Sequence, residues 1–351
     1  MEKLTVKKFG VTEGGDRSYL YVLRNDKGLV VTVTDYGATL VNVLVPDKNG
    51  EIKDVVLGYD GVAGYEKNGG NLGATVGRNA NRIGGAAFEL NGRRYELDKN
   101  DNGHNNLHSG PDYYNKRMWE VTENGDDHVT FMLHSPDGDQ GYPGTIDMYV
   151  TYSLDEDNTL TIHYEAVPDQ DTVINMTNHS YFNLNGHDSG DVLEHVVTLE
   201  ADAFTPADAE SIPTGEIRPV DGTPMDFRGG QKIGARIDED YEPLNFGGGY
   251  DHNWVLKNEG RFDKVAEVSS EKSGIRMEVL TDLPGVQMYT ANFLNGVTGK
   301  DGAVYGKRNA VCLETQYYPD AIHHENFPGP VCNAGEKYDT RTAYRFLTED
   351  K

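Results

Sequence analysis

Short stretches of the chain alternate between apolar and polar residues, which is the pattern of half-buried β-strands. In residues 160–167, LTIHYEAV, the apolar positions Leu, Ile, Tyr and Ala alternate with Thr, His and Glu. The same period of two recurs in residues 28–37, 40–47, 129–133 and 148–154. We therefore predict a strand in each of these five stretches.

Clusters of Gly, Asn and Asp separate the alternating stretches. Gly adopts positive φ at no steric cost, and Asn and Asp side chains hydrogen-bond the nearby backbone, so these clusters predict turns and loops. No stretch longer than about ten residues holds a helical period with capping residues. The pattern predicts an all-β protein with long loops. Because no linker, composition shift or fixed repeat divides the chain, we expect a single domain over residues 1–351.

Charge excludes one large class of partners. The chain has 32 basic and 57 acidic residues, which give a formal net charge of −25. Nucleic-acid binding depends on Lys and Arg side chains that neutralise phosphates, so we expect no nucleic-acid partner. A strongly acidic chain also repels its own copies, which favours a monomer.

The start of the chain, MEKLTVKKFGVTEGG, has no apolar core of a signal peptide, and no apolar run reaches the length of a membrane span. We therefore expect a cytoplasmic protein with no membrane partner. The two cysteines, Cys312 and Cys332, form no disulfide framework, and their spacing matches no zinc pattern. We expect both to be free thiols.

Several motifs resemble metal or cofactor sites but lack a necessary part. Residues 98–103, DKNDNG, begin like a calcium loop, yet Ser109 stands where that loop needs Glu. His104 and His108 are four residues apart, a ligand spacing only on a helix, and their surroundings NGHNNLHSGP disfavour one. We interpret residues 323–325, HHE, as part of a surface loop. GxGxxG and P-loop patterns are absent, so we expect no metal ion and no cofactor.

Six polar clusters remain, and each combines amide, imidazole, carboxylate or guanidinium groups with an aromatic residue or a turn glycine. Sugars present hydroxyls that donate and accept hydrogen bonds, together with apolar C–H faces that rest on aromatic rings. These groups in this mixture therefore indicate a sugar site. The clusters are GRNANRIGG (77–85), NNLHSG (105–110), NMTNHSYFNLNG (175–186), YDHNW (250–254), LPGVQMYTANF (283–293) and VCLETQYYPDAIHH (311–324).

Taken in this order, the clusters resemble the aldose 1-epimerases, also called galactose mutarotases. The resemblance extends from DYGATL near residue 35 to ETQYYPDA near residue 320, and the motifs GRxANRI, NNLHSG, NxTNHSYFNL and ETQxxPDA carry it. It implies a large antiparallel β-sandwich with a sugar cleft on one sheet. It also implies interconversion of the α- and β-anomers of free aldohexoses such as galactose and glucose.

The resemblance further implies the role of each site residue. Glu314 is the expected general base on the C1 hydroxyl, and His179 is the expected general acid at the ring oxygen. Such a pair suffices for ring opening and closure without a metal ion. An ionised Glu314 favours a protonated His179, so we expect a bell-shaped pH dependence with an acid limb from the carboxylate and an alkaline limb from the imidazole. The expected substrate-binding residues are Asn81, Arg82, His108, Asp251 and Gln287.

Structural roles are the alternative for several of these residues. Asn81 can instead stabilise the GRNANRI loop, and Asp251 can cap the turn that follows GGGY. We interpret His104, His252 and His323 as structural.

Two other functions compete with the mutarotase interpretation. An epimerase of hexose 6-phosphates needs a cluster of Arg or Lys to hold the phosphate, but the motifs contain only Arg78 and Arg82. A sugar-binding protein without catalysis needs neither Glu314 nor His179, yet the chain has both. A sugar-converting enzyme is therefore the function that the sequence favours.

Overall fold

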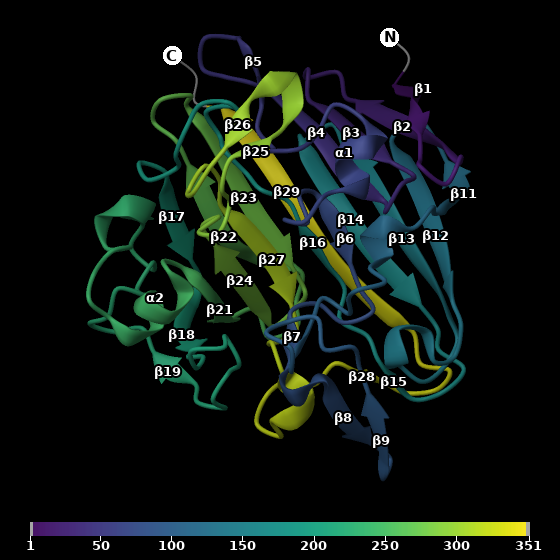
Figure 1. Cartoon of the computed structure of the whole chain (residues 1–351). Coiled ribbons are helices and arrows are strands. Elements are labelled where there is room, and N and C mark those ends of the chain that lie inside the picture. The colour runs from purple at the N-terminus through teal and green to yellow at the C-terminus, as the bar shows by residue number, and fades with distance from the viewer. Residues whose placement is uncertain (1–2, 349–351) are drawn as a thin grey trace.

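The computed structural model describes residues 3–348, which form mainly β-strands joined by long loops. The largest sheet, here the back sheet, is antiparallel and has nine strands. Figure 1 shows β29 (Tyr338–Thr348), in yellow, running through the middle of the molecule between β14 (Thr159–Ala166) and β23 (Ile275–Thr281). The remaining strands of the back sheet are β11 (Glu120–Asn124), β12 (His128–Ser135) and β13 (Ile146–Leu154) on the β14 side, and β22 (Asp263–Ser269), β17 (Val196–Leu199) and β20 (Gln231–Lys232) on the β23 side.

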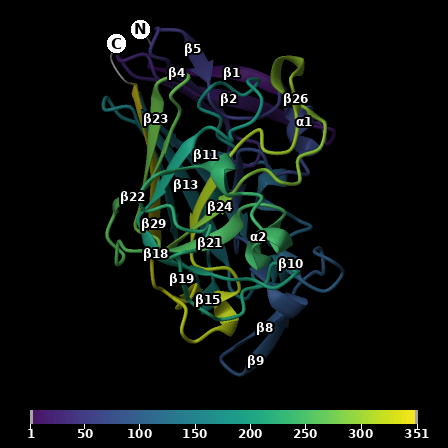
Figure 2. The same cartoon turned by 90° about the vertical axis from the view of Figure 1, so that its left-hand side faces the viewer.

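A sheet of five strands, here the front sheet, packs face to face against the back sheet, and Figure 2 shows the two layers side by side. Trp254 and Val286 of the front sheet share one apolar core with Met277 of the back sheet. The Tyr344 hydroxyl on β29 donates a hydrogen bond across the core to the Leu313 carbonyl at 3.3 Å. The two layers therefore form a sandwich. In order, the front sheet contains β19 (Arg218–Pro219), β18 (Ala201–Thr205), β21 (Asp251–Leu256), β24 (Gly285–Tyr289) and β27 (Cys312–Gln316).

A third sheet, built from the N-terminal part of the chain, lies across one end of the sandwich, at the top of Figure 2. Its residues Val31 and Val43 belong to the same apolar core as Phe346 of the back sheet. One core thus joins residues from both ends of the described chain. The strands of this sheet are, in order, β1 (Leu4–Val11), β2 (Arg17–Arg24), β3 (Val30–Thr34), β4 (Thr39–Pro46) and β5 (Ile52–Asp54).

Five short strand pairs hold the loops that connect the sheets. They are β6 (Ala74–Val76) with β16 (Thr177–His179), β7 (Arg82–Ile83) with β10 (Asn106–Leu107), β8 (Ala87–Leu90) with β9 (Arg93–Glu96), β15 (Thr172–Val173) with β28 (Val331–Cys332), and β25 (Val297–Thr298) with β26 (Val304–Tyr305).

Helices are few and short. The described residues contain two α-helices, α1 (Val62–Glu66) and α2 (Glu242–Gly247), and six single turns of 3₁₀-helix. In α2, Pro243 occupies the first turn, and Gly248 ends the helix with a left-handed φ of 63°. Within residues 3–348, no helix has the length and apolar character that crossing a membrane requires.

The alternating pattern predicted these strands correctly. All five predicted stretches lie on strands, and along β14 every second residue is buried, beginning at Leu160. The all-β prediction is therefore confirmed. Cys312 and Cys332 are free thiols, as expected, and both are buried.

Candidate active site

The outer face of the front sheet, which points away from the back sheet, carries the polar residues of three sequence clusters. Residues directly opposite each other in an antiparallel pair project from the same face. Asn253, Gln287 and Glu314 are opposite one another across β21, β24 and β27 and form one row. The next row on this face is Asp251, Tyr289 and Cys312. Strand register thus gathers residues from sequence positions 251 to 314 on one surface.

A cavity of about 590 Å³ opens over this face, a volume within the usual range of small-molecule sites. It brings together residues from the front sheet, from β16 and from the loops around residues 81 and 108. Six of the seven predicted site residues line it: Asn81, Arg82, His108, His179, Asp251 and Glu314.

His179 and Glu314 face each other in this cavity. Residues Thr177–His179 form β16, which lies against β27, so that His179 Nε2 is 3.5 Å from Glu314 Oε1. Both side chains are buried. Among the residues that the structure describes, none hydrogen-bonds His179 Nδ1 or Glu314 Oε2. An acid and a base are thus held within reach of one small ligand.

Burial shifts the two groups in opposite directions. It raises the pKa of Glu314 well above its ordinary value, an effect that the nearby Asp251 increases and Arg82 opposes. Burial also lowers the pKa of His179 to about 4. The expectation that Glu314 keeps His179 protonated therefore differs from the structure, because removal from water disfavours both charges. If the pair shares one proton, burial favours its residence on Glu314.

Two hydrogen bonds join Asn81 and His108. The His108 N–H donates to the Asn81 carbonyl at 2.9 Å, and the Asn81 N–H donates to His108 Nδ1 at 3.0 Å. Both residues have left-handed φ values, 60° and 53°, which Asn and His adopt more readily than most residues. With Nδ1 occupied as an acceptor, the neutral ring carries its proton on Nε2. Burial, followed by the effects of His179 and Arg82, lowers the pKa of His108 well below its ordinary value, so this ring stays neutral.

Arg82 is held at the cavity wall by an acidic partner. Its Nε donates to Asp101 Oδ2 at 2.8 Å, and both side chains are largely buried. Asp101 belongs to the stretch DKNDNG that resembles a calcium loop, and sequence reasoning missed this ion pair with Arg82. Arg78 is fully buried and donates to the carbonyls of Pro143 and Gly144 at 2.9 and 2.8 Å, so it anchors the GRNANRI loop.

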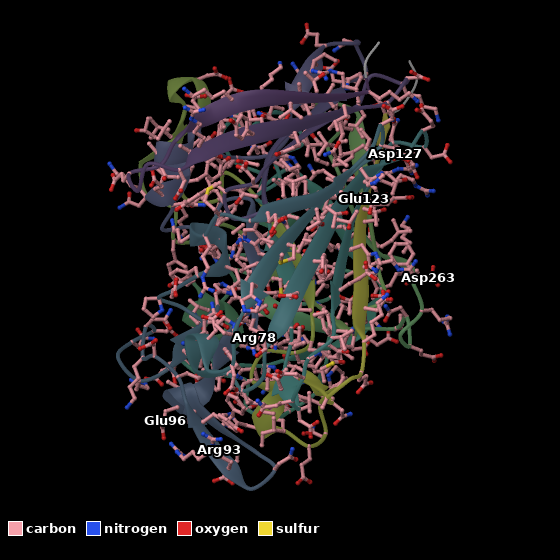
Figure 3. All side chains as sticks on the ribbon, turned by 90° about the vertical axis from the view of Figure 1, so that its right-hand side faces the viewer. Arg78, Arg93, Glu96, Glu123, Asp127 and Asp263 are labelled. Carbon is pink, nitrogen blue, oxygen red and sulfur yellow. The ribbon has the colours of Figure 1, made fainter. Side chains whose placement is uncertain are left out.

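Figure 3 labels Arg78 in the body of the molecule, whereas Arg93 and Glu96 mark the β8–β9 hairpin at one end. The Arg78 guanidinium also donates to the Ser135 hydroxyl at 2.6 Å, which ties it to the end of β12. Its donors are thus directed at protein oxygens, and Arg82 is the arginine of this loop that lines the cavity.

The structure places Asp251 and Gln287 differently. Asp251 lines the cavity, whereas Gln287 is buried and does not line it. The Gln287 Nε2 donates to Asp251 Oδ1 at 2.8 Å. The amide of Gln287 therefore holds Asp251 in place, and direct contact between Gln287 and the sugar stays a prediction.

Aromatic residues of the cavity were not singled out from the sequence. Tyr181 stacks on the His179 ring with centroids 5.0 Å apart and an interplanar angle of 21°, and Tyr289 meets that ring edge-on at 6.1 Å. Phe293 stacks on Tyr289 at the cavity rim, and its side chain is exposed. Tyr289 stands two positions after Gln287 on β24, so the period of two could have pointed to it, whereas Tyr181 lies beyond the end of β16 and had no such signal.

Two groups of side chains resemble metal ligands. His108, His179 and Glu314 bring one donor atom each within 4.8 Å of one another. A metal ion would have to displace the proton that the Asn81 N–H fixes on His108 Nε2, so these donors suit a sugar oxygen better. His163, Glu165 and Asp339 form a second group on the outer face of the back sheet. Lys337 forms ion pairs with both carboxylates of that group and so offsets part of their negative charge.

The histidines interpreted as structural lie outside the cavity lining. His104 Nε2 pairs with Glu210 at 2.7 Å, His323 pairs with Asp320 at 2.7 Å, and the buried His252 ring contacts the Pro243 carbonyl at 3.0 Å.

Similarity to known proteins extends over nearly the whole chain. The aldose 1-epimerase family model matches residues 19–345. The galactose mutarotase of Bos taurus is 43% identical to this chain over 329 residues, which are 93% of each chain. That of Homo sapiens is 41% identical over 350 residues, 99% of each chain. The aldose 1-epimerase of Escherichia coli (strain K12) is 37% identical over 335 residues, 94% of this chain and 95% of its own.

Solved structures have the same fold. An aldose epimerase homologue from C. elegans, 32% identical, superposes with a TM-score of 0.87 over 95% of this chain and 100% of its own. Galactose 1-epimerase from Lactobacillus acidophilus, 27% identical, has a TM-score of 0.86 and covers 99% of each chain.

The sandwich and its cleft, taken with these relatives, define an enzyme that converts sugars. The chain belongs to the aldose 1-epimerase family, and it is an isomerase that interconverts the anomers of aldoses.

Proposed function

We propose that Glu314 is the general base and His179 the general acid of anomer interconversion, acting on a free aldohexose such as galactose or glucose. Glu314 takes the proton of the C1 hydroxyl while His179 gives a proton to the ring oxygen, and the C1–O5 bond opens. Rotation about C1–C2 and the reverse transfers close the ring as the other anomer. Both groups return to their starting protonation states at the end of each cycle.

The observation that carries this proposal is the 3.5 Å approach of His179 Nε2 to Glu314 Oε1 inside the cavity. The directions of the pKa shifts support it. A carboxylate with a raised pKa is a stronger base, and an imidazolium with a lowered pKa is a stronger acid. In the reactive form the shared proton has moved from Glu314 to His179, and from that form both shifts favour the two proton transfers that open the ring.

Polarimetry of freshly dissolved α-D-galactose and α-D-glucose tests the proposal. We expect the purified protein to accelerate the approach to the equilibrium rotation for at least one of these sugars. Unchanged rates for both sugars would overturn the choice of a free aldohexose as substrate. Acceleration that survives in variants of Glu314 and His179 would overturn the assigned roles instead.

The pKa shifts predict which group controls each limb of the pH profile. With the shared proton favoured on Glu314, the pair takes up a second proton near the pKa of His179, about 4, and loses the shared proton at the raised pKa of Glu314. We expect kcat/KM to follow a bell whose alkaline limb reports Glu314, which reverses the assignment expected from the sequence. The charge of Asp251 raises the pKa of Glu314, so Asp251→Asn should move the alkaline limb to lower pH.

The control for this experiment is Asp251→Glu, which changes the contact with the sugar but keeps the charge. Its alkaline limb should stay near that of the unchanged protein, even if its KM rises. An alkaline limb that does not move in Asp251→Asn would show that a group other than Glu314 controls it.

Asp251 and Gln287 should act on binding as one unit. Asp251→Ala removes a charged hydrogen-bond acceptor, and we expect KM to rise roughly tenfold or more with a smaller change in kcat. Gln287→Ala should raise KM less, because the amide acts through Asp251. The double variant should match Asp251→Ala alone. Steady-state kinetics of the three variants check this, and additive effects on KM would mean that Gln287 contacts the sugar itself.

The cations of the cavity favour an uncharged sugar over a hexose phosphate. Among the residues that line it, the basic ones are Lys67 and Arg82. Arg82 is paired with Asp101 at 2.8 Å, and Lys67 Nζ lies 3.9 Å from Glu13. A phosphate group would compete with these carboxylates for both cations.

We further propose that the protein is a single-domain monomer that acts on a free monosaccharide in the cytoplasm, without a cofactor. The shared apolar core supports a single domain, and the net charge of −25 supports a monomer. Light scattering coupled to size-exclusion chromatography measures the oligomeric state directly.

A further inference from the structure

The His179 ring lies against two tyrosine rings, those of Tyr181 and Tyr289. Catalytic histidines are commonly oriented by a hydrogen bond to the second ring nitrogen. Here, within residues 3–348, no other residue hydrogen-bonds the buried His179 Nδ1, and only the backbone of His179 itself opposes the lowering of its pKa by burial. The ring plane therefore depends on the side chains that lie against it.

We propose that Tyr181 is a positioning residue for His179, whose aromatic face holds the imidazole in the plane needed for proton transfer and stabilises its protonated form. This inference rests on the proposed role of His179 as the general acid. It is carried by the stacked contact of the two rings, with centroids 5.0 Å apart and planes 21° apart.

Tyr181 is itself held rigidly. Its side chain is buried, and its hydroxyl donates to the Gly70 carbonyl at 2.6 Å. Its own carbonyl accepts the Leu57 N–H at 3.0 Å. Tyr289 meets the Tyr181 ring edge-on at 6.0 Å. Because the hydroxyl, the backbone and the ring of Tyr181 are each held by a neighbour, Tyr181 can hold the His179 ring that stacks on it.

The aromatic face also has an electrostatic effect. A cation over the face of a tyrosine ring, within about 6 Å of its centroid, is attracted by the negative charge of the π system. An imidazolium at position 179 is placed in this way, whereas a neutral imidazole gains less. The stack therefore offsets part of the burial that lowers the pKa of His179.

Other groups around His179 also influence its charge. Glu314 faces it from β27, His108 meets its ring edge-on at 5.5 Å, and Asp251 and Arg82 line the same cavity. A substitution at Tyr181 leaves the chemical identity of all these groups unchanged. A change at Tyr181 therefore isolates the contribution of the stacked ring.

The test compares Tyr181→Leu, which removes the aromatic face, with Tyr181→Phe, which keeps the face and loses only the hydroxyl. We expect Tyr181→Leu to lower kcat by roughly tenfold to a hundredfold, the usual effect of a misaligned catalytic group, with little change in KM. Tyr181→Phe should restore most of the lost kcat. A Tyr181→Leu variant that keeps its full kcat would overturn the inference.

A second readout follows the charge of His179 directly. In an NMR titration, with His179→Asn used to assign the resonance, Tyr181→Leu should lower the pKa of His179 by about one unit. An unchanged pKa would overturn the electrostatic part of the inference. Full activity of His179→Asn would refute the general-acid role, and the titration would still test the stack.

Two additional proteins separate this effect from a loss of stability. Tyr95→Leu removes a tyrosine stacked on Phe88 at 5.3 Å and 20°, in the β8–β9 hairpin, and should keep kcat.

If Tyr181→Leu does not fold, fluorinated phenylalanines at position 181 keep the ring shape but withdraw electron density from its face. Under our proposal, the pKa of His179 then falls stepwise with fluorine content, and a constant pKa would contradict it.

Discussion

Replacing Glu314 by Gln is expected to lower kcat by roughly 10² to 10⁴, the usual contribution of one general acid–base group. The amide has nearly the shape of the carboxyl group but cannot take the C1 proton. Since no described residue hydrogen-bonds Glu314 Oε2, the change breaks few contacts within the protein, and KM should change little. Polarimetric progress curves at several sugar concentrations measure both constants.

Stability provides an independent check on this variant. Burial raises the pKa of Glu314, which means that the fold disfavours its charged form. Glu314→Gln should therefore melt at the same temperature as the unchanged protein or a higher one. Glu165→Gln, which removes a carboxylate from β14 on the outer face of the back sheet, should keep kcat. If Glu314→Gln retains more than about a tenth of kcat, the base must be another group, with Asp251 the next candidate.

Replacing His179 by Asn should have an effect of the same size, because the ring oxygen then lacks its proton donor. The kcat of the double variant His179→Asn/Glu314→Gln tests whether the two groups act together. A base without its acid cannot complete the ring opening, so the double variant should lose little more than either single variant. Multiplied losses would mean that the two groups act in separate steps. His163→Asn, which removes a surface imidazole paired with Asp339 at 2.7 Å, is the matched control.

The fold class was accessible from the sequence because strand periodicity is a local property. In β14 the alternation of LTIHYEAV appears directly as alternating burial. The same pattern did not reveal the central place of β29 between β14 and β23, since pairing partners far apart in the chain leave no mark on either strand alone. The sandwich came only from the family resemblance.

The sequence predicted which residues belong to the site better than it predicted what each of them contacts. Six of the seven named residues line one cavity, but the role of Gln287 depends on the register of β21 and β24, which places its amide against Asp251. The charge states of Glu314 and His179 also could not be predicted from the sequence. The family resemblance implies that Glu314 and His179 act as a pair, whereas the extent of their burial, which decides the pKa shifts, is a property of the complete fold.

The position of β29 has a consequence for how the protein acquires its shape. β29 is the last strand in chain order, yet it forms the seam between β14 and β23, and its Tyr344 reaches β27 through the core. During synthesis, β14 and β23 leave the ribosome before β29. Until β29 follows, each of them has one edge without a pairing strand. Such long-range pairing is slow, and the exposed edges favour aggregation until it occurs. The cleft above β27 is therefore completed late in folding, so partly synthesised chains should require chaperone protection and should not open sugar rings.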